Sequence, residues 1–200
     1  MIDTLIFDYG NTLVRFCEPE LAATYTDSPE DAALLCEVFF SREYWQKLDE
    51  GKLTHEEWIA SAKGRLPERL HPTLHEIAAT WYYRLPAIDG MAELVKKLKA
   101  RGVKLYLLSN ISRAFAEHIS EFPLLLLFDG LICSAVYEVA KPDPAIYRML
   151  IDTYKLATNG CVFVDDRQEN LDAAVKFGIH PYLFDGDAAK LSAYLDTVLA

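Results

Sequence analysis

Several polar residues of this 200-residue sequence stand at or near the ends of apolar runs, where folding could bring them together. Runs of Leu, Ile, Val and Phe without alternation are typical of strands buried on both faces of a parallel sheet. Ligands bind beyond the carboxyl ends of such strands, so the sequence predicts one site built from several strand ends. The residues are Asp8, Ser109, Asn110, Lys141, Asp165 and Asp166.

Asp8 ends the first apolar run, Leu5 to Phe7, where a carboxylate can be a nucleophile or a metal ligand. As a nucleophile it would attack phosphorus and form an aspartyl phosphate, which divides one difficult displacement into two easier ones. Asp165 and Asp166 could hold a hard cation that neutralises the oxygens of a phosphoryl group. The simpler alternatives are a helix-capping role for Asp8 and a solvated turn for the two adjacent acids.

Ser109, Asn110 and Lys141 are candidates for binding an anion. Ser109 offers a hydroxyl, and Ser109 and Asn110 offer backbone N–H groups near the start of a following helix. Lys141 stands just before two prolines and would bring a compact positive charge to Asp8 and to a phosphate. The alternatives are a plain Ser N-cap and a lone surface lysine.

Four short segments, in their order and spacing, resemble those of the haloacid dehalogenase superfamily, a large group of phosphohydrolases that use an Asp nucleophile. The segments are FDYGNTL at 7–13, LLSN at 107–110, KPDPAIY at 141–147 and VFVDDRQEN at 162–170, and they span nearly the whole chain. The resemblance implies a Rossmann-like α/β core with a parallel sheet in the order 3-2-1-4-5, and an inserted helical C1 cap as in subfamily I. It also implies Mg²⁺ as cofactor and a small phosphorylated metabolite as substrate.

The resemblance also implies a role for each matching residue. Asn170 stands where many members carry another acid, an exchange that weakens the metal shell. Asp165 would assist the metal directly or through water. The implied catalytic residues are Asp8 and Lys141, the phosphate-binding residues are Ser109, Asn110 and Lys141, and the metal ligands are Asp8, Gly10, Asp165 and Asp166.

Gly10 departs from the pattern, because most phosphatases of this superfamily carry a second Asp there that transfers protons. The Gly10 carbonyl can serve a cation but moves no proton, and a general acid contributes about 10²- to 10⁴-fold. The sequence therefore favours substrates with acidic leaving groups, such as sugar 1-phosphates. The DxGN form resembles a subgroup that includes bacterial glucose-1-phosphate phosphatases. Alternatively the inserted helices supply the acid, with His55, Glu56 or Glu57 as candidates, although a capping box explains Glu57.

Helical signals fill roughly residues 15–85, whereas alternating helix and strand signals follow from Asp89 and Gly90 onward. Helices are predicted after Ser28 and Thr54 and over about 72–83. We therefore predict a core domain of residues 1–14 and 86–200 and a helical cap of residues 15–85. Aromatic residues of the cap would form its core or line a substrate pocket, and the core is favoured. They are Phe39, Phe40, Tyr44, Trp45 and Trp58.

The composition limits the partners and the compartment. A formal net charge of −10 without a Lys/Arg cluster counts against nucleic-acid binding. The sequence shows no leader-like or membrane-spanning apolar stretch, so a cytoplasmic protein is expected. The four cysteines have no paired spacing and are expected to be free thiols. The sequence does not indicate an oligomeric state.

Three other functions stay open at this stage. A metal-independent 2-haloacid dehalogenase also lacks the second Asp, but it would leave the Asp165–Asp166 pair idle and would carry a Tyr in place of Gly10. A catalytically impaired phosphate-binding or partner-binding protein is consistent with Gly10 and Asn170. A phosphomutase would pass the phosphoryl group to a sugar, and this reaction depends strongly on proton transfer.

Overall fold

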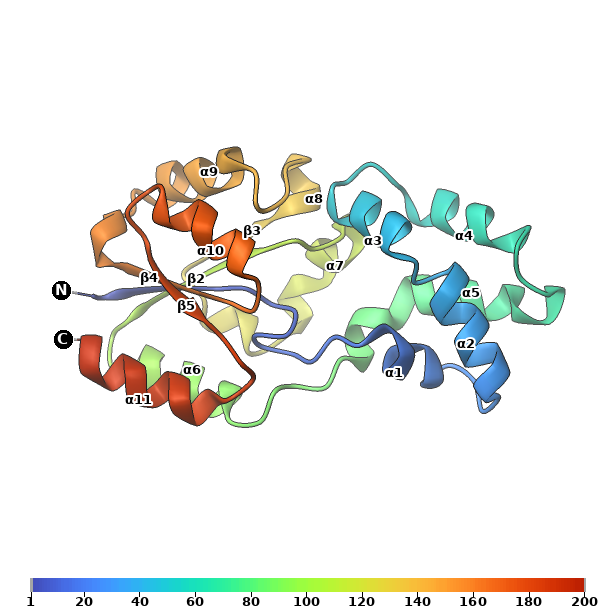
Figure 1. Ribbon diagram of the computed structural model, residues 1–200, viewed down its shortest axis with the longest axis horizontal. Coiled ribbons are helices and arrows are strands. Elements are labelled where there is room, and N and C mark those ends of the chain that lie inside the picture. Colours follow the sequence, from blue (N-terminus) through green and yellow to red (C-terminus); the bar gives the residue numbers. More distant parts are fainter. Residues whose placement is uncertain (1, 200) are drawn as a thin grey trace.

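The computed structural model describes residues 2–199, and within them five strands form one parallel sheet in the order β3-β2-β1-β4-β5 (Figure 1). This order confirms the predicted α/β core. β1 lies at the centre and pairs with β2 on one side and β4 on the other. The residues that follow these three strands therefore lie near one another. The strands are β1 (Thr4–Phe7), β2 (Lys104–Ser109), β3 (Gly130–Cys133), β4 (Cys161–Asp165) and β5 (His180–Leu183).

Every residue of β1 and β4 is buried, which explains why their sequences do not alternate between apolar and polar. Adjacent side chains of β1 point to opposite faces, because Phe7 belongs to one hydrophobic cluster and Ile6 to another. Helices cover both faces of the sheet (Figure 1). They are α6 (Met91–Ala100) and α11 (Ala188–Val198) on one face, and α9 (Pro144–Tyr154) and α10 (Gln168–Val175) on the other.

Two short helices follow the strands on the β2 side of the sheet. α7 (Arg113–His118) follows β2, and α8 (Ser134–Tyr137) follows β3 directly. The amide of Ile111 donates a hydrogen bond to Ser134 Oγ at 2.9 Å, which ties the loop after β2 to the start of α8. Single 3₁₀ turns also occur at Ile119–Glu121, Leu125–Leu127 and Thr158–Gly160.

The chain forms a helical insertion, residues 18–84, between β1 and α6. This insertion lies beyond the carboxyl ends of the strands (Figure 1). The residues described there form helices and turns and no strand. The helices are α1 (Glu18–Ala23), α2 (Pro29–Val38), α3 (Arg42–Asp49), α4 (His55–Lys63) and α5 (His71–Thr80), with 3₁₀ helices at Glu68–Leu70 and Trp81–Arg84.

Two helix starts in the insertion agree with the sequence signals. Ser28 Oγ accepts a hydrogen bond from the backbone of the first turn of α2, and Thr54 and Glu57 form the reciprocal capping box of α4. Helices α1 and α3 were not predicted. α1 has only six residues, and α3 is mostly polar and fully buries only Leu48.

Two further observations concern the chain as a whole. None of the described helices is both long and apolar enough to cross a membrane. All four cysteines are free thiols, in agreement with their spacing in the sequence.

Trp58 holds the helices of the insertion together. Its ring stacks on Phe39 with centroids 3.8 Å apart, and its Nε1 donates to the Phe39 carbonyl at 2.8 Å. We expect Trp58→Ala to lower the free energy of unfolding by about 3–5 kcal/mol, because it leaves a cavity. Leu126→Ala, at a position 65% exposed, should change it by less than about 0.5 kcal/mol. Urea unfolding measures both, and equal small effects would contradict this account of the insertion.

Candidate active site

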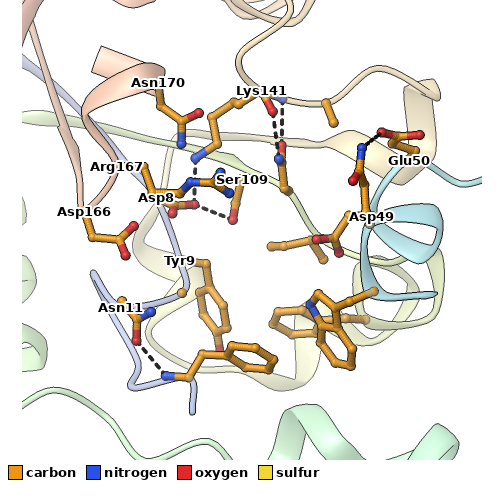
Figure 2. A pocket seen from close by; sticks show the side chains of 18 of the residues that line it. Asp8, Tyr9, Asn11, Asp49, Glu50, Ser109, Lys141, Asp166, Arg167 and Asn170 are labelled. Carbon is orange, nitrogen blue, oxygen red and sulfur yellow. Dashed lines mark hydrogen bonds and ion pairs between the residues drawn. The ribbon is translucent and has the colours of Figure 1, made fainter. Parts of the chain in front are cut away.

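The carboxyl ends of the three central strands bring the predicted site residues together (Figure 2). Asp8 directly follows β1, Ser109 ends β2, and Asp165 ends β4 with Asp166 next to it. Lys141 reaches the same place from the loop between α8 and α9. Strand order, rather than proximity in the sequence, therefore assembles this cluster.

Lys141 makes the central contacts of the cluster. Its side chain is only 1% exposed, and its Nζ lies 2.8 Å from Asp8 Oδ1 and 2.6 Å from Asp165 Oδ2. Ser109 Oγ donates a second hydrogen bond to Asp8 Oδ1 at 2.6 Å. Among residues 2–199, no group donates a hydrogen bond to Asp8 Oδ2. One oxygen of Asp8 is thus held in place, and the other is free to react or to bind a ligand.

Asp165 is saturated with hydrogen bonds. Its Oδ1 accepts from the Arg167 amide at 2.8 Å and from Asn170 Nδ2 at 2.9 Å. Its Oδ2 accepts from Lys141 and, at 3.0 Å, from Asn170 Nδ2. Asp165 therefore positions Lys141 and the loop after β4, and Asn170 holds Asp165 where another acid would repel it.

The side chain of Asn110 binds the backbone of the lysine loop. Its Nδ2 donates to the Lys141 carbonyl at 3.0 Å, and its Oδ1 accepts from the Lys141 amide at 2.8 Å. This amide side chain therefore positions Lys141 instead of pointing to a ligand. The capping alternative for Ser109 is wrong, because α7 begins later and is capped by Ser112. The capping alternative for Asp8 is also wrong, since α1 is the next helix and has Cys17 as its N-cap residue.

The electrostatics follow from burial and from the central lysine. Burial, opposed by Lys141 and reinforced by Asp165, raises the pKa of Asp8 to about 6. Burial alone would lower the pKa of Lys141, but Asp165 and Asp8 outweigh it and raise the pKa. Burial and the neighbouring Asp165 also raise the pKa of Asp166. The cluster therefore gains from added positive charge.

The donor atoms at this site fit a hard divalent cation. Single carboxylate oxygens of Asp8, Asp165 and Asp166 lie within 4.8 Å of one another. Gly10 lines the same pocket and adds a backbone carbonyl. Oxygen donors of this kind, completed by water, suit Mg²⁺. Because Asp165 is already saturated, Asp8, Asp166 and the Gly10 carbonyl are the best available ligands.

A cavity of about 680 Å³ lies between the cluster and the insertion. Three of its lining residues form an aromatic wall. The ring centroid of Trp45 lies 4.9 Å from that of Phe16 and 4.7 Å from that of Trp81. Trp45 is the only one of the five cap aromatics named above that lines the described cavity. The others belong to the hydrophobic core or pack against it, as the sequence favoured.

The acids proposed from the sequence for the insertion do not line this cavity. Glu57 is used in the capping box, Glu56 is exposed on α4, and the His55 ring packs against Trp58. Asp49, the last residue of α3, does line it, and the sequence interpretation missed it. The helical spacing of Trp45 and Leu48 could have predicted α3, but nothing in a chain this acidic sets its last Asp apart.

The structure thus defines a class of α/β proteins in which a doubly covered parallel sheet carries a carboxylate cluster and a buried lysine at its strand ends. Residues 2–178 match the family model of the haloacid dehalogenase-like hydrolases. The chain belongs to this family, and it is therefore a hydrolase. The sequence resemblance at superfamily level is thus confirmed.

Three similar proteins illustrate the range of the family. The sesquiterpene phosphatase astK of Aspergillus oryzae is 28% identical over 146 residues, which cover 71% of this chain and 72% of that protein. A structure of an enzyme from Bacteroides thetaiotaomicron with magnesium and inorganic phosphate has a TM-score of 0.75 at 18% identity, covering 96% and 99% of the two chains. The L-2-haloacid dehalogenase of Xanthobacter autotrophicus has a TM-score of 0.66 at 20% identity, covering 100% and 89%.

Replacing the central lysine tests the electrostatics. Lys141→Met leaves two carboxylates buried without their cation, so the pKa of Asp8 should rise further. An acid whose pKa in the native state exceeds 3.8 binds more protons there, and the variant therefore loses stability as the pH rises above that value. We expect a deficit of about 3–5 kcal/mol near neutral pH that shrinks towards about pH 5.

Urea unfolding across this pH range measures the deficit. Lys96→Met is the matched control, because Lys96 is exposed on α6. The control should follow the wild type at every pH. A deficit in Lys141→Met that does not change with pH would contradict the charge account.

Proposed function

We propose that this chain is a Mg²⁺-dependent phosphatase of a small phosphorylated metabolite, with Asp8 as its nucleophile. One observation carries the proposal: Asp8 is held through Oδ1 by Ser109 and Lys141, its Oδ2 accepts no hydrogen bond from residues 2–199, and its carboxylate lies within 4.8 Å of that of Asp166. A nucleophile needs such a fixed position with one exposed electron pair. The phosphatase named among the relatives adds support.

The proposed reaction has two steps. Asp8 Oδ2 attacks phosphorus, the bond to the leaving oxygen breaks, and an aspartyl phosphate remains; water then attacks phosphorus and releases phosphate. Lys141 and Ser109 orient Asp8 and present positive charge and a hydroxyl to the phosphoryl oxygens. Bound Mg²⁺, held by Asp8, Asp166 and the Gly10 carbonyl, would neutralise charge on those oxygens.

The domain division proposed from the sequence suits this reaction. Residues 1–14 and 86–200 would form the catalytic core, and residues 15–85 would be a cap that excludes water and selects the substrate. The cavity supports this view, because Trp45 and Gln46 of α3 line it together with the Asp8 cluster. Asn110 retains a role through the position of Lys141, and its backbone N–H is the part of it that we propose for phosphate binding.

A sugar 1-phosphate is the substrate class that we favour. Its anomeric oxygen is more acidic than an ordinary alcohol, so it is the better leaving group however much help an acid gives, and Gly10 gives none. The aromatic wall beside polar groups of α3 suits a sugar ring, whose faces are apolar and whose edges bear hydroxyls.

A 2-haloacid dehalogenase is the main alternative function, because the fold is shared with an L-2-haloacid dehalogenase. The cluster of three carboxylates counts against it, since attack on carbon requires no cation. Halide release from 2-chloropropionate without added metal would favour the dehalogenase.

The nucleophile and the metal can be tested together by phosphate release. We expect Asp8→Asn to lower kcat by about 10³-fold or more. Asp166→Asn should raise the Mg²⁺ concentration needed for half-maximal activity by at least about tenfold. Asp172→Asn, exposed on α10, should change neither value. Activity that survives chelation by EDTA or the Asp8 substitution would refute the proposal.

A panel of phosphorylated sugars tests the substrate class. We expect kcat/KM to be about tenfold or more higher for glucose 1-phosphate than for glucose 6-phosphate, because the anomeric oxygen is the better leaving group. Equal values, or a preference for the 6-phosphate, would rule out this substrate class and leave the phosphatase proposal standing.

A further inference from the structure

Asp49 ends α3 with its carboxyl group pointing into the cavity, on the side opposite the strand ends that carry Asp8 and Ser109 (Figure 2). Among residues 2–199, no group donates a hydrogen bond to this carboxyl group. The adjacent Glu50 differs, because Gln46 and Lys52 each bind its side chain at 2.8 Å. Asp49 is therefore a pocket carboxyl group without an internal partner.

The backbone around Asp49 is fastened to the core of the molecule. Ser134 Oγ, at the start of α8, donates to the Asp49 carbonyl at 2.5 Å. Two residues on, Gly51 has φ +68°, and a Cβ there would lie 2.6 Å from the Ala135 carbonyl oxygen. No side chain fits at Gly51 without moving one backbone away from the other. These contacts hold Asp49 at a fixed position relative to Asp8.

Four charged groups act on Asp49 from the elements around the cavity. Burial is the largest effect and raises the pKa of Asp49 well above its usual range; Asp8 and Glu50 raise it further. Lys141 and, to a smaller extent, Arg167 oppose this shift. A carboxyl group in this environment carries a proton at pH values where an exposed Asp has lost it. It can donate that proton once a substrate lies between it and Asp8.

We propose that Asp49 is the general acid and base of the reaction, supplied by the insertion in place of the side chain that Gly10 lacks. This inference rests on the phosphatase function proposed above. When Asp8 Oδ2 bonds to phosphorus, the electron pair of the breaking P–O bond goes to the leaving oxygen, which takes the Asp49 proton. Water then attacks phosphorus and gives a proton to Asp49, and the electron pair of the breaking bond returns to Asp8.

The space around Gly10 allows an acidic side chain to be placed there in a variant that lacks Asp49. A Cβ added at Gly10 would meet only the Phe16 Cβ, at 3.9 Å, which is ordinary van der Waals contact. The Cβ of Gly10→Asp therefore fits without displacing the backbone. An acid on the first strand loop can then be tested as a replacement for Asp49.

The test compares Asp49→Asn with the wild type on two substrates. With glucose 6-phosphate, whose leaving group needs a proton, kcat should fall by about 10²- to 10⁴-fold with little change in KM. With p-nitrophenyl phosphate, whose leaving group needs none, kcat/KM, which reports only the steps up to departure of the leaving group, should fall by less than about tenfold. The alkaline limb of the kcat–pH profile for glucose 6-phosphate should also disappear. Glu56→Gln, exposed on α4, is the control and should match the wild type.

A second variant separates catalysis from folding. Adding Gly10→Asp to Asp49→Asn should restore activity on glucose 6-phosphate by at least about tenfold, because it returns a proton donor to the site. Equal losses of kcat/KM on both substrates, a loss confined to KM, or no recovery in the double variant would overturn the assignment of Asp49. A wild type without phosphatase activity would instead overturn the proposed function, and the role of Asp49 with it.

Discussion

The buried ion pairs of Lys141 are the constraint on which the site depends. One ammonium group lies 2.8 Å from Asp8 and 2.6 Å from Asp165, inside a protein where none of the three groups could be charged alone at low cost. The pair with Asp165 anchors the lysine. Asn170 donates a hydrogen bond to Asp165, and Asn110 accepts one from the backbone amide of Lys141. The pair with Asp8 then fixes one oxygen of the carboxylate and leaves the other free.

The insertion adds side chains to the cavity that begins at the strand ends. Its aromatic core, centred on Trp58, belongs to the same hydrophobic cluster as one face of the sheet, while α3 turns Trp45 and Asp49 towards the cavity. The hydrogen bond from Ser134 to the Asp49 carbonyl joins the insertion to the core at one point beside the site. A part of the chain that is remote in sequence from Asp8 can thereby supply a group that acts opposite to it.

The sequence predicted the fold and the cluster well, because both depend on local patterns. Unbroken apolar strands that end on polar residues specify a parallel sheet, and its order places Asp8, Ser109 and Asp165 together. The exact function of each residue was harder to predict from the sequence. Asn110 was expected to offer its backbone N–H to a phosphate, and the hydrogen bonds of its side chain to the Lys141 backbone were not foreseen, because contacts of that kind leave no trace in residue spacing.

The insertion shows where prediction from sequence fails. Candidates for the missing acid were sought beside the capping box at His55 to Glu57, whereas the cavity is faced by Asp49 from a polar helix with weak sequence signals. Which face of such a helix meets the site depends on packing between distant segments. A single sequence carries little information on this, so the structure was needed to find Asp49.

The central claim is that Asp8 carries the phosphoryl group during the reaction. Acid quenching during turnover, followed by mass spectrometry of the peptides, tests it most directly. The account predicts phosphate on the peptide that contains Asp8 when a phosphorylated substrate and Mg²⁺ are present, and none in the Asp8→Asn variant. Phosphate on another residue, or a carbon-linked ester on Asp8 after incubation with a 2-haloacid, would contradict it.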